Sequence, residues 1–320
     1  MHLLWEQIVN KLRLLLLVGL ISIQVMACDN SENPVNKSSK IVLVTGATGT
    51  QGGAVARELV KRGYSVQGLS RNPGSQRALE LTELGIRVIK GDFDDAASLD
   101  AAMQDVYGVF AVTNYWEHGF EREIAHGRQL IDAAERAGVR HFVFSSVAGA
   151  DSDSDLPHFD SKAQIEAYLG NSAVEYTIVR PVEFLDNLQD LRPELMAGSF
   201  VDPRDSEKSH QWIAARDIGF FVGEAFDNPA TWIGVTEEIA GVEMTLTEFT
   251  AAISTVLSVD VQHIQVSWED YEVVAGTEIT EMVRWFDEVG YAADIERLRD
   301  EHPDLLTVED YLTGEGWNNR

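Results

Sequence analysis

Residues 41–53 read IVLVTGATGTQGG, and they give the strongest indication of the fold class. Its first four residues are apolar and mostly β-branched, as in a strand buried inside a parallel sheet. The glycines that follow are spaced by three. Gly46 permits a tight turn, Gly49 lets backbone N–H groups approach a pyrophosphate, and Gly52 lets the next helix pack closely. Because a helix is expected from Gly53 onward, strand, loop and helix together predict a dinucleotide-binding site.

Outward from this stretch, short apolar runs alternate with amphipathic helical stretches. Such alternation is typical of βαβ units. We therefore expect an α/β fold, a Rossmann-type doubly wound parallel sheet over residues 40–181. A smaller, mixed C-terminal substrate or lid region is expected over residues 182–320, with a returning strand near residues 232–235. The expected strands of the sheet are residues 41–44, 65–69, 87–89, 108–112, 142–144 and 176–179. The expected helices are residues 53–62, 76–84, 97–103, 121–137 and 162–169.

The end of the second strand decides which dinucleotide is bound. An NAD site places Asp or Glu there to accept hydrogen bonds from the ribose hydroxyls. Here the sequence is SRNP over residues 70–73, with Arg77 following and no carboxylate nearby. A guanidinium pairs well with a 2′-phosphate, so Arg71 predicts NADP(H) as the cofactor. The alternative is that Arg71 stacks on the adenine ring.

Two further strand ends carry polar residues. Asp92 and Phe93 follow the third strand, where a carboxylate can accept a hydrogen bond from the adenine amino group. A helix-capping or turn role for Asp92 is the alternative. Thr113 and Asn114 follow the fourth strand, and parallel sheets bind ligands at these carboxyl ends.

The N-terminal segment predicts an export signal. Lys11 and Arg13 precede an apolar run over residues 14–27, which is shorter than the roughly 20 residues of a membrane-spanning helix. Residues 25–28 read VMAC and resemble a lipoprotein-processing box that ends in Cys28; a polar tether follows over residues 29–39. We therefore expect membrane association through a lipidated signal segment. The alternatives are an uncleaved helical anchor and a true start at Met26, which would leave a cytoplasmic protein.

The composition argues against a nucleic-acid-binding protein, a disulfide-bonded protein and a protein with a cysteine metal site. The net charge is −27, whereas nucleic-acid binding requires a cationic surface. Cys28 is the only cysteine, so no internal disulfide can form and no thiol cluster is available for a metal. We predict neither a nucleic-acid partner nor a metal site.

Taken together, these motifs resemble the NmrA-like family of atypical short-chain dehydrogenases, and within it the NADPH-sensing branch. The resemblance covers residues 40–311. VTNYWE and HFDSK are its more specific parts, because general Rossmann proteins do not share them. The stretches that carry the resemblance are VTGATGTQGG (44–53), SRNP (70–73), GDFDD (91–95), VTNYWE (112–117), HFDSK (158–162) and MVRWF (282–286).

The resemblance also identifies candidate site residues. In active short-chain dehydrogenases a tyrosine four residues before a lysine donates a proton, and the lysine holds the nicotinamide ribose. No tyrosine here has a lysine four positions later, and His158 stands in its place ahead of Lys162. The resemblance implies a ribose contact for Lys162. For His158 it leaves a catalytic, a cofactor-contact and a structural role open. Other implied positions are Ser145 and Ser146 as carbonyl-orienting or packing residues, Tyr115 and Trp116 as pocket wall or core, and Pro181, Phe184 and Asn187 beside the nicotinamide.

The missing tyrosine decides between two functions. We expect an NADP(H)-binding redox sensor or regulator that acts through a protein partner. The alternative is an NADPH-dependent oxidoreductase that reduces a quinone or a small carbonyl compound, so whether the protein is an enzyme is left open. The candidate catalytic residues are His158 and Lys162. The predicted cofactor-binding residues are Gly46, Thr48, Gly49, Thr50, Gln51, Gly52, Arg71, Asp92, Phe93, Thr113, Asn114 and Lys162.

Overall fold

The computed structural model describes residues 37–318. The predicted signal segment, Cys28 and residues 29–36 of the tether lie outside the described residues. The last three residues assigned to the tether form the 3₁₀ helix η1 (Lys37–Ser39), and Lys37 pairs with Asp227 at 2.5 Å. The predicted end of the tether at residue 39 is therefore too late. Within residues 37–318 no helix is long and apolar enough to cross a membrane.

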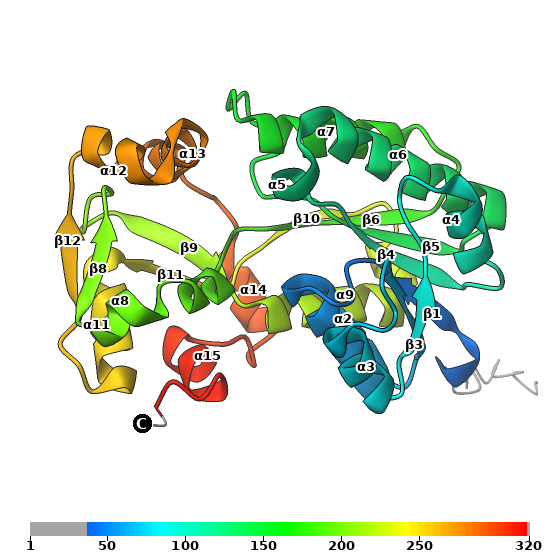
Figure 1. The fold of residues 1–320 in the computed structure, drawn as a ribbon, viewed down its shortest axis with the longest axis horizontal. Helices are drawn as coiled ribbons and strands as arrows, with labels where there is room; N and C mark the ends of the chain where they lie inside the picture. The colour runs from blue at the N-terminus through cyan, green and yellow to red at the C-terminus, as the bar shows by residue number, and fades with distance from the viewer. Residues whose placement is uncertain (1–36, 319–320) are drawn as a thin grey trace, which may run out of the picture. The chain divides into compact units, whose positions relative to one another are not determined.

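A seven-stranded parallel sheet in the order β10-β6-β5-β4-β1-β2-β3 forms the larger part of the fold (Figure 1). The order runs outward from β1 in both directions, so it reverses between β1 and β4. At such a switch point the carboxyl ends of the strands leave a crevice for a ligand. The strands are β1 (Ile41–Val44), β2 (Ser65–Ser70), β3 (Arg87–Lys90), β4 (Gly108–Val112), β5 (His141–Ser145), β6 (Tyr176–Pro181) and β10 (Thr236–Ile239).

Helices cover both faces of this sheet, which confirms the predicted Rossmann-type α/β class (Figure 1). Alternate residues of a strand point to opposite faces. Val42 and Val44 accordingly pack in one apolar cluster with α2 and α9, and Leu43 packs in the other with α4, α6 and α7. All three side chains are fully buried. The helices are α2 (Thr50–Lys61), α3 (Gln76–Glu83), α4 (Ala96–Ala102), α5 (Tyr115–His118), α6 (Phe120–Ala137), α7 (Pro157–Gly170) and α9 (Ala215–Asp227).

Three elements differ from the sequence prediction by more than two residues. Helix α2 begins at Thr50 rather than Gly53, so its N-terminus lies inside the glycine loop. Helix α7 begins at Pro157, five residues before the predicted start, because proline suits the first turn of a helix. The returning strand is β10 and not residues 232–235, since Pro229 starts the short helix α10 (Pro229–Trp232) and a turn follows it.

The remaining C-terminal elements build a smaller region. A three-stranded sheet has the order β11-β9-β7, and β12 pairs with β8. Trp212 of β9 and Phe249 of α11 stack with their ring centroids 4.4 Å apart. The elements are β7 (Glu183–Phe184), η2 (Leu185–Gln189), α8 (Arg192–Met196), β8 (Ser199–Asp202), β9 (Ser209–Ile213), β11 (Val242–Thr245), α11 (Leu246–Leu257), β12 (Gln262–Gln265), α12 (Trp268–Ala275), α13 (Thr277–Glu288), α14 (Ile295–Glu301) and α15 (Val308–Gly314).

Candidate functional site

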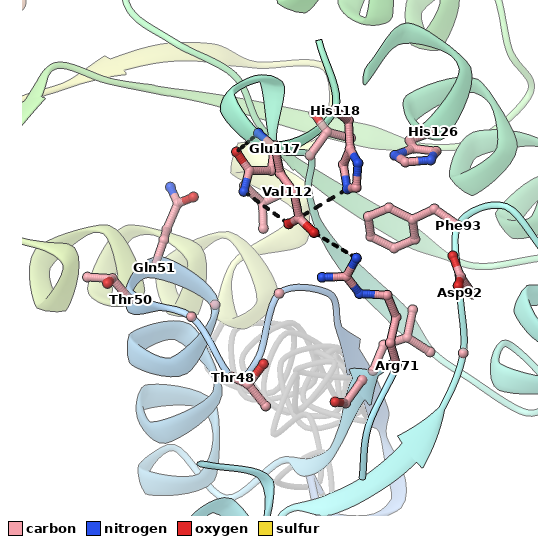
Figure 2. Close-up of a pocket in the computed structure, with 18 of the residues that line it drawn as sticks. Thr48, Thr50, Gln51, Arg71, Asp92, Phe93, Val112, Glu117, His118 and His126 are labelled. Atoms are coloured by element: carbon pink, nitrogen blue, oxygen red, sulfur yellow. Dashed lines mark hydrogen bonds and ion pairs between the residues drawn. The ribbon is translucent and has the colours of Figure 1, made fainter. Parts of the chain in front are cut away.

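A cavity of about 670 Å³ lies at the carboxyl ends of the central strands, where the strand order reverses. We call it the strand-end cavity (Figure 2). Every residue predicted to bind the cofactor lines it except Lys162. The predicted residues in its lining are Gly46, Thr48, Gly49, Thr50, Gln51, Gly52, Arg71, Asp92, Phe93, Thr113 and Asn114.

The glycine loop leaves no room for side chains. Gly46 has a φ of +60°, and a Cβ there would lie 2.8 Å from Val112. A Cβ at Gly52 would lie 2.3 Å from the carbonyl oxygen of Gly46, which is far inside van der Waals contact. Gly49, the residue before the first turn of α2, supplies no side-chain cap to the helix. The first N–H groups of α2 are thus available for an anionic ligand, and the loop fits a dinucleotide pyrophosphate.

Arg71 has a carboxylate partner that the sequence analysis excluded. Glu117 of α5 lies across the cavity, and its Oε1 is 2.7 Å from Nη1 of Arg71 (Figure 2). The pairing raises the pKa of Arg71 and lowers that of Glu117. Asn114 caps α5 by accepting from the backbone N–H of Glu117 at 3.3 Å. The prediction that no carboxylate lies near Arg71 is therefore wrong, because α5 brings Glu117, which is distant in sequence, to the guanidinium.

Asp92 takes the predicted turn role and also lies in the lining of the cavity. Its side chain lines the strand-end cavity, and its Oδ1 also accepts from the backbone N–H of Asp94 at 3.1 Å. The adjacent Phe93 makes an edge contact with His126, whose Nε2 lies 2.9 Å from Asp94. This end of the cavity therefore offers an aromatic face and a carboxylate.

Lys162 lies behind the cavity wall rather than in its lining. Its Nζ donates to Oγ1 of Thr113 at 2.7 Å and lies 2.9 Å from Oε1 of Glu123. Glu123 is fully buried and also accepts from Ser161. Burial alone would raise the pKa of Glu123, but Lys162, Ser161 and Thr113 together lower it. The lysine thus compensates a buried carboxylate that the sequence analysis did not identify.

His158 sits in an aromatic environment. The residue is 8% exposed, and the centroid of its ring lies 5.1 Å from that of Trp116 and 5.7 Å from that of Tyr115. Neither ring nitrogen has a hydrogen-bond partner among the described residues. Burial lowers the pKa of His158 to about 4, so the imidazole is neutral at pH 7 and is a poor proton donor.

Of the other polar residues that the resemblance singled out, Tyr115 and Ser145 are engaged by neighbours and Ser146 is not. Burial and a hydrogen bond to Glu278 of α13 raise the pKa of Tyr115 to about 12. Ser145 accepts from Nε2 of Gln51 at 2.6 Å, which ties β5 to the glycine loop. The hydroxyl of Ser146 is buried without a partner among the described residues. This arrangement provides no ready general acid beside the glycine loop.

A second cavity of about 520 Å³ lies within the C-terminal region, and we call it the C-terminal cavity. Phe184 lines both cavities, and Asn187 lines this one. Its charged residues include Arg204, whose guanidinium donates to Asp202 at 2.8 and 2.9 Å and to Glu183 at 2.9 Å. The part of the chain that the structure describes holds no group of His, Cys, Asp and Glu side chains suited to a metal.

The fold and the strand-end cavity define a Rossmann-type dinucleotide-binding protein. A model of the NmrA-like family matches residues 38–313, so the chain belongs to the NmrA-like family, as its motifs predicted. An NmrA-like family domain-containing protein of Dictyostelium discoideum is 32% identical over 79% of this chain and 89% of the relative. An NmrA-like oxidoreductase of Aspergillus hancockii is 31% identical, and there the chain spans 59% of the relative's length.

Solved structures show the same fold. NmrA, a negative transcriptional regulator crystallised with NADP, superposes with a TM-score of 0.72 at 21% identity, over 88% of this chain and 98% of NmrA. An NADPH-dependent quinone oxidoreductase of Escherichia coli superposes with a TM-score of 0.73 at 24% identity, over 86% of this chain and 99% of that protein. At these identities the likeness establishes the fold.

Proposed function

We propose that the chain binds NADP(H) in the strand-end cavity and acts as an oxidoreductase on an organic substrate in the C-terminal cavity. The observation that carries this proposal is Phe184, which lines both cavities. Because Phe184 borders both cavities, a ligand in the C-terminal cavity would lie next to the cofactor site, as a reaction between the two requires. The C-terminal cavity also has the volume typical of small-molecule sites.

The residues of the strand-end cavity suit each part of the cofactor. The N-terminus of α2 would hold the pyrophosphate, Arg71 the 2′-phosphate, and Phe93 with Asp92 the adenine. When bound, NADP(H) supplies hydride chemistry. The protein's own part is to orient the substrate beside Phe184 and to exclude water.

The regulator predicted from the sequence is the second candidate, and one set of contacts favours it. Helix α5 carries both Glu117, the partner of Arg71, and Tyr115, the partner of Glu278 on α13. A 2′-phosphate that competes for Arg71 would release Glu117 and alter this link to α13. Cofactor binding would then change a surface available to a protein partner, without turnover.

One pair of measurements separates the two functions. Calorimetry should detect NADPH binding, and the absorbance of NADPH should fall when quinones or aldehydes are added. Binding without oxidation of NADPH by any member of the panel would contradict the oxidoreductase and favour the regulator. If His158→Tyr then creates turnover, the missing tyrosine is the cause of inactivity.

We also propose membrane association through residues 14–28, on the sequence pattern alone. Fractionation of cells that express the full-length chain tests it. The proposal predicts protein in the membrane fraction and its release by Cys28→Ser. Soluble protein that is unchanged by this substitution would favour the start at Met26 and a cytoplasmic location.

A further inference from the structure

Lys162 is fully engaged inside the protein. Its Nζ lies 3.3 Å from the carbonyl oxygen of Thr113, 2.7 Å from Oγ1 of the same residue and 2.9 Å from Oε1 of Glu123. An ammonium group has three N–H donors, so these three oxygen atoms are as many as Lys162 can serve. A direct contact between Lys162 and a ligand would require one of these interactions to break.

Glu123 fixes the direction of the Thr113 hydroxyl group. The carboxylate is fully buried, and it accepts from Ser161 and, at 2.8 Å, from Oγ1 of Thr113. An ionised carboxylate can only accept hydrogen bonds, so the single hydroxyl proton of Thr113 points toward Glu123. Toward every other neighbour, Oγ1 of Thr113 is therefore a hydrogen-bond acceptor, as it already is toward Lys162.

Thr113 is the member of this network that borders the strand-end cavity. Glu123 and Lys162 are not part of the lining. The two oxygen atoms of Thr113 that hold Lys162, its hydroxyl and its carbonyl, can only accept from a ligand. A ligand that bonds to them must bring a donor, which a hydroxyl or an amide group has and an ionised phosphate lacks.

The place of Thr113 in the sheet indicates which half of a dinucleotide it meets. A dinucleotide lies across the carboxyl ends of the strands, with one nucleotide on each side of the switch point. Arg71, Asp92 and Phe93 lie together on one side of the glycine loop, after β2 and β3, and suit the adenosine half (Figure 2). Thr113 follows β4, which lies on the opposite side of β1. It therefore belongs to the nicotinamide half.

Thr113 also adjoins the glycine loop. The preceding residue, Val112, donates its backbone N–H to Oγ1 of Thr45 at 2.8 Å, and Thr45 stands directly before Gly46. In the nicotinamide half, the ribose is joined to the pyrophosphate that this loop fits, whereas the carboxamide lies at the far end of the nicotinamide ring. Of the two donor groups in this half, the ribose hydroxyls are thus the nearer to Thr113.

We propose that Thr113 accepts a hydrogen bond from a hydroxyl group of the nicotinamide ribose, and that Glu123 is the positioning residue that keeps Thr113 in this accepting orientation. Lys162 acts through Thr113 and does not contact the ribose itself, in contrast to the role that the family resemblance implies. This inference deepens the cofactor half of the proposed function and rests on NADP(H) binding alone, so its test needs no turnover.

Two ligands separate the halves of the cofactor. NADPH contains the nicotinamide ribose, whereas adenosine 2′,5′-bisphosphate keeps the adenosine and the 2′-phosphate but lacks it. Calorimetry of the full chain should show that Thr113→Val weakens NADPH binding about three- to tenfold, as expected for one neutral hydrogen bond, and leaves binding of the bisphosphate nearly unchanged. Thr113→Ser retains the hydroxyl group and should recover most of the loss. Unchanged NADPH binding by Thr113→Val would overturn the contact.

Glu123→Gln tests the positioning role. The amide can donate to Oγ1 of Thr113 as well as accept from it, so NADPH affinity should fall by about two- to tenfold while the bisphosphate binds as before. Because Glu123 acts through Thr113, Glu123→Gln should cause no further loss in a Thr113→Val background. Glu121→Gln removes an exposed carboxylate from the same helix, α6, and is the matched control. Equal losses for both ligands, or additive losses in the double variant, would overturn the positioning role.

Lys162→Met serves two purposes in the same experiment. If Glu123→Gln does not fold, the combination with Lys162→Met removes both buried charges and takes its place, with the same expected loss for NADPH alone. In a Thr113→Val background, Lys162→Met should not weaken NADPH binding further relative to the bisphosphate. A further loss specific to NADPH would show that Lys162 contacts the ribose directly and would overturn its indirect role.

A third ligand separates the ribose from the carboxamide. 3-Acetylpyridine adenine dinucleotide phosphate keeps the ribose but carries no amide N–H. Thr113→Val should weaken its binding as much as that of NADP⁺, and an effect confined to NADP⁺ would overturn the ribose contact in favour of the carboxamide. Failure of the unmodified chain to bind NADPH or the bisphosphate would overturn the proposed cofactor site as a whole. Binding of both without any effect of Thr113→Val would overturn this inference alone.

Discussion

The strand-end cavity and the C-terminal cavity share Phe184 but are built in opposite ways. The first is made largely of backbone and strand ends, and its glycines leave space for a ligand that every Rossmann protein of this type binds. The second is made of side chains from scattered loops, strands and helices, with a buried ionic cluster in its wall. A ligand common to many proteins can thus be recognised by main-chain groups, whereas selectivity for a particular ligand requires side chains.

A buried cation compensates buried carboxylates beside each cavity: Arg204 in the wall of the C-terminal cavity and Lys162 behind the strand-end cavity. We expect the larger loss of stability when Arg204 is replaced. Arg204→Gln would leave both Glu183 and Asp202 uncompensated, so we expect a loss of about 3–5 kcal/mol of unfolding free energy or more. Denaturant unfolding measures it. Arg136→Gln, which removes the half-exposed pair with Asp100, should cost less than about 1 kcal/mol. Equal effects of the two substitutions would show that the cluster is not a structural requirement.

Lys162→Met is the corresponding change behind the strand-end cavity. It leaves the single buried carboxylate of Glu123 without its cation, so we expect a loss of about 3–5 kcal/mol that does not exceed that of Arg204→Gln. Adding Glu123→Gln should restore part of the stability. A variant that is fully stable but no longer binds NADPH would instead assign Lys162 to the cofactor ribose.

Arg71→Ala tests selectivity within the strand-end cavity. The charge-assisted bond to the 2′-phosphate should be lost, which lowers the affinity for NADPH by about 1.5–3 kcal/mol and that for NADH little. Calorimetry with both cofactors measures it. Equal affinities of the unmodified chain for NADPH and NADH would mean that Arg71 does not select between them.

We expect the smallest effect for Glu117→Gln, which should strengthen NADPH binding rather than weaken it. Because Glu117 competes for Arg71 at a partly exposed site, its removal should tighten NADPH binding by about 0.2–1 kcal/mol and leave NADH unchanged. In an Arg71→Ala background the same substitution should have no effect. Weaker NADPH binding on Glu117→Gln would indicate that Glu117 contacts the cofactor directly.

The two cavities also differ in how far the sequence alone predicts them. Strands and helices of the sheet depend on local periodicity, and the glycine loop is continuous in sequence, so the fold class and most of the strand-end lining were accessible. The roles of Glu117 and Glu123 could not be predicted, because they arise from contacts with Arg71 and Lys162 that only the folded chain creates. Glu117 stood inside the quoted VTNYWE motif, which was the available signal.

The C-terminal cavity was almost entirely inaccessible to sequence reasoning. Of its lining, only Phe184, Asn187 and Val283, the last within MVRWF, had been singled out, through the family resemblance. Its members come from residues 183–283, and no periodicity relates Glu183 to Arg204 or Trp212 to Phe249. A returning strand was expected, near residues 232–235 rather than at β10, but the packing of α9 on the large sheet was not.

The wall that Phe184 provides to both cavities has a thermodynamic consequence. A side chain that borders both sites can make the binding of one ligand depend on the presence of the other, through its position and its mobility. Any such dependence is reciprocal: the factor by which NADP(H) changes the affinity for the second ligand must equal the factor by which that ligand changes the affinity for NADP(H). Phe184 is therefore a position at which a substitution can change the cooperativity of the pair while each ligand, taken alone, binds much as before.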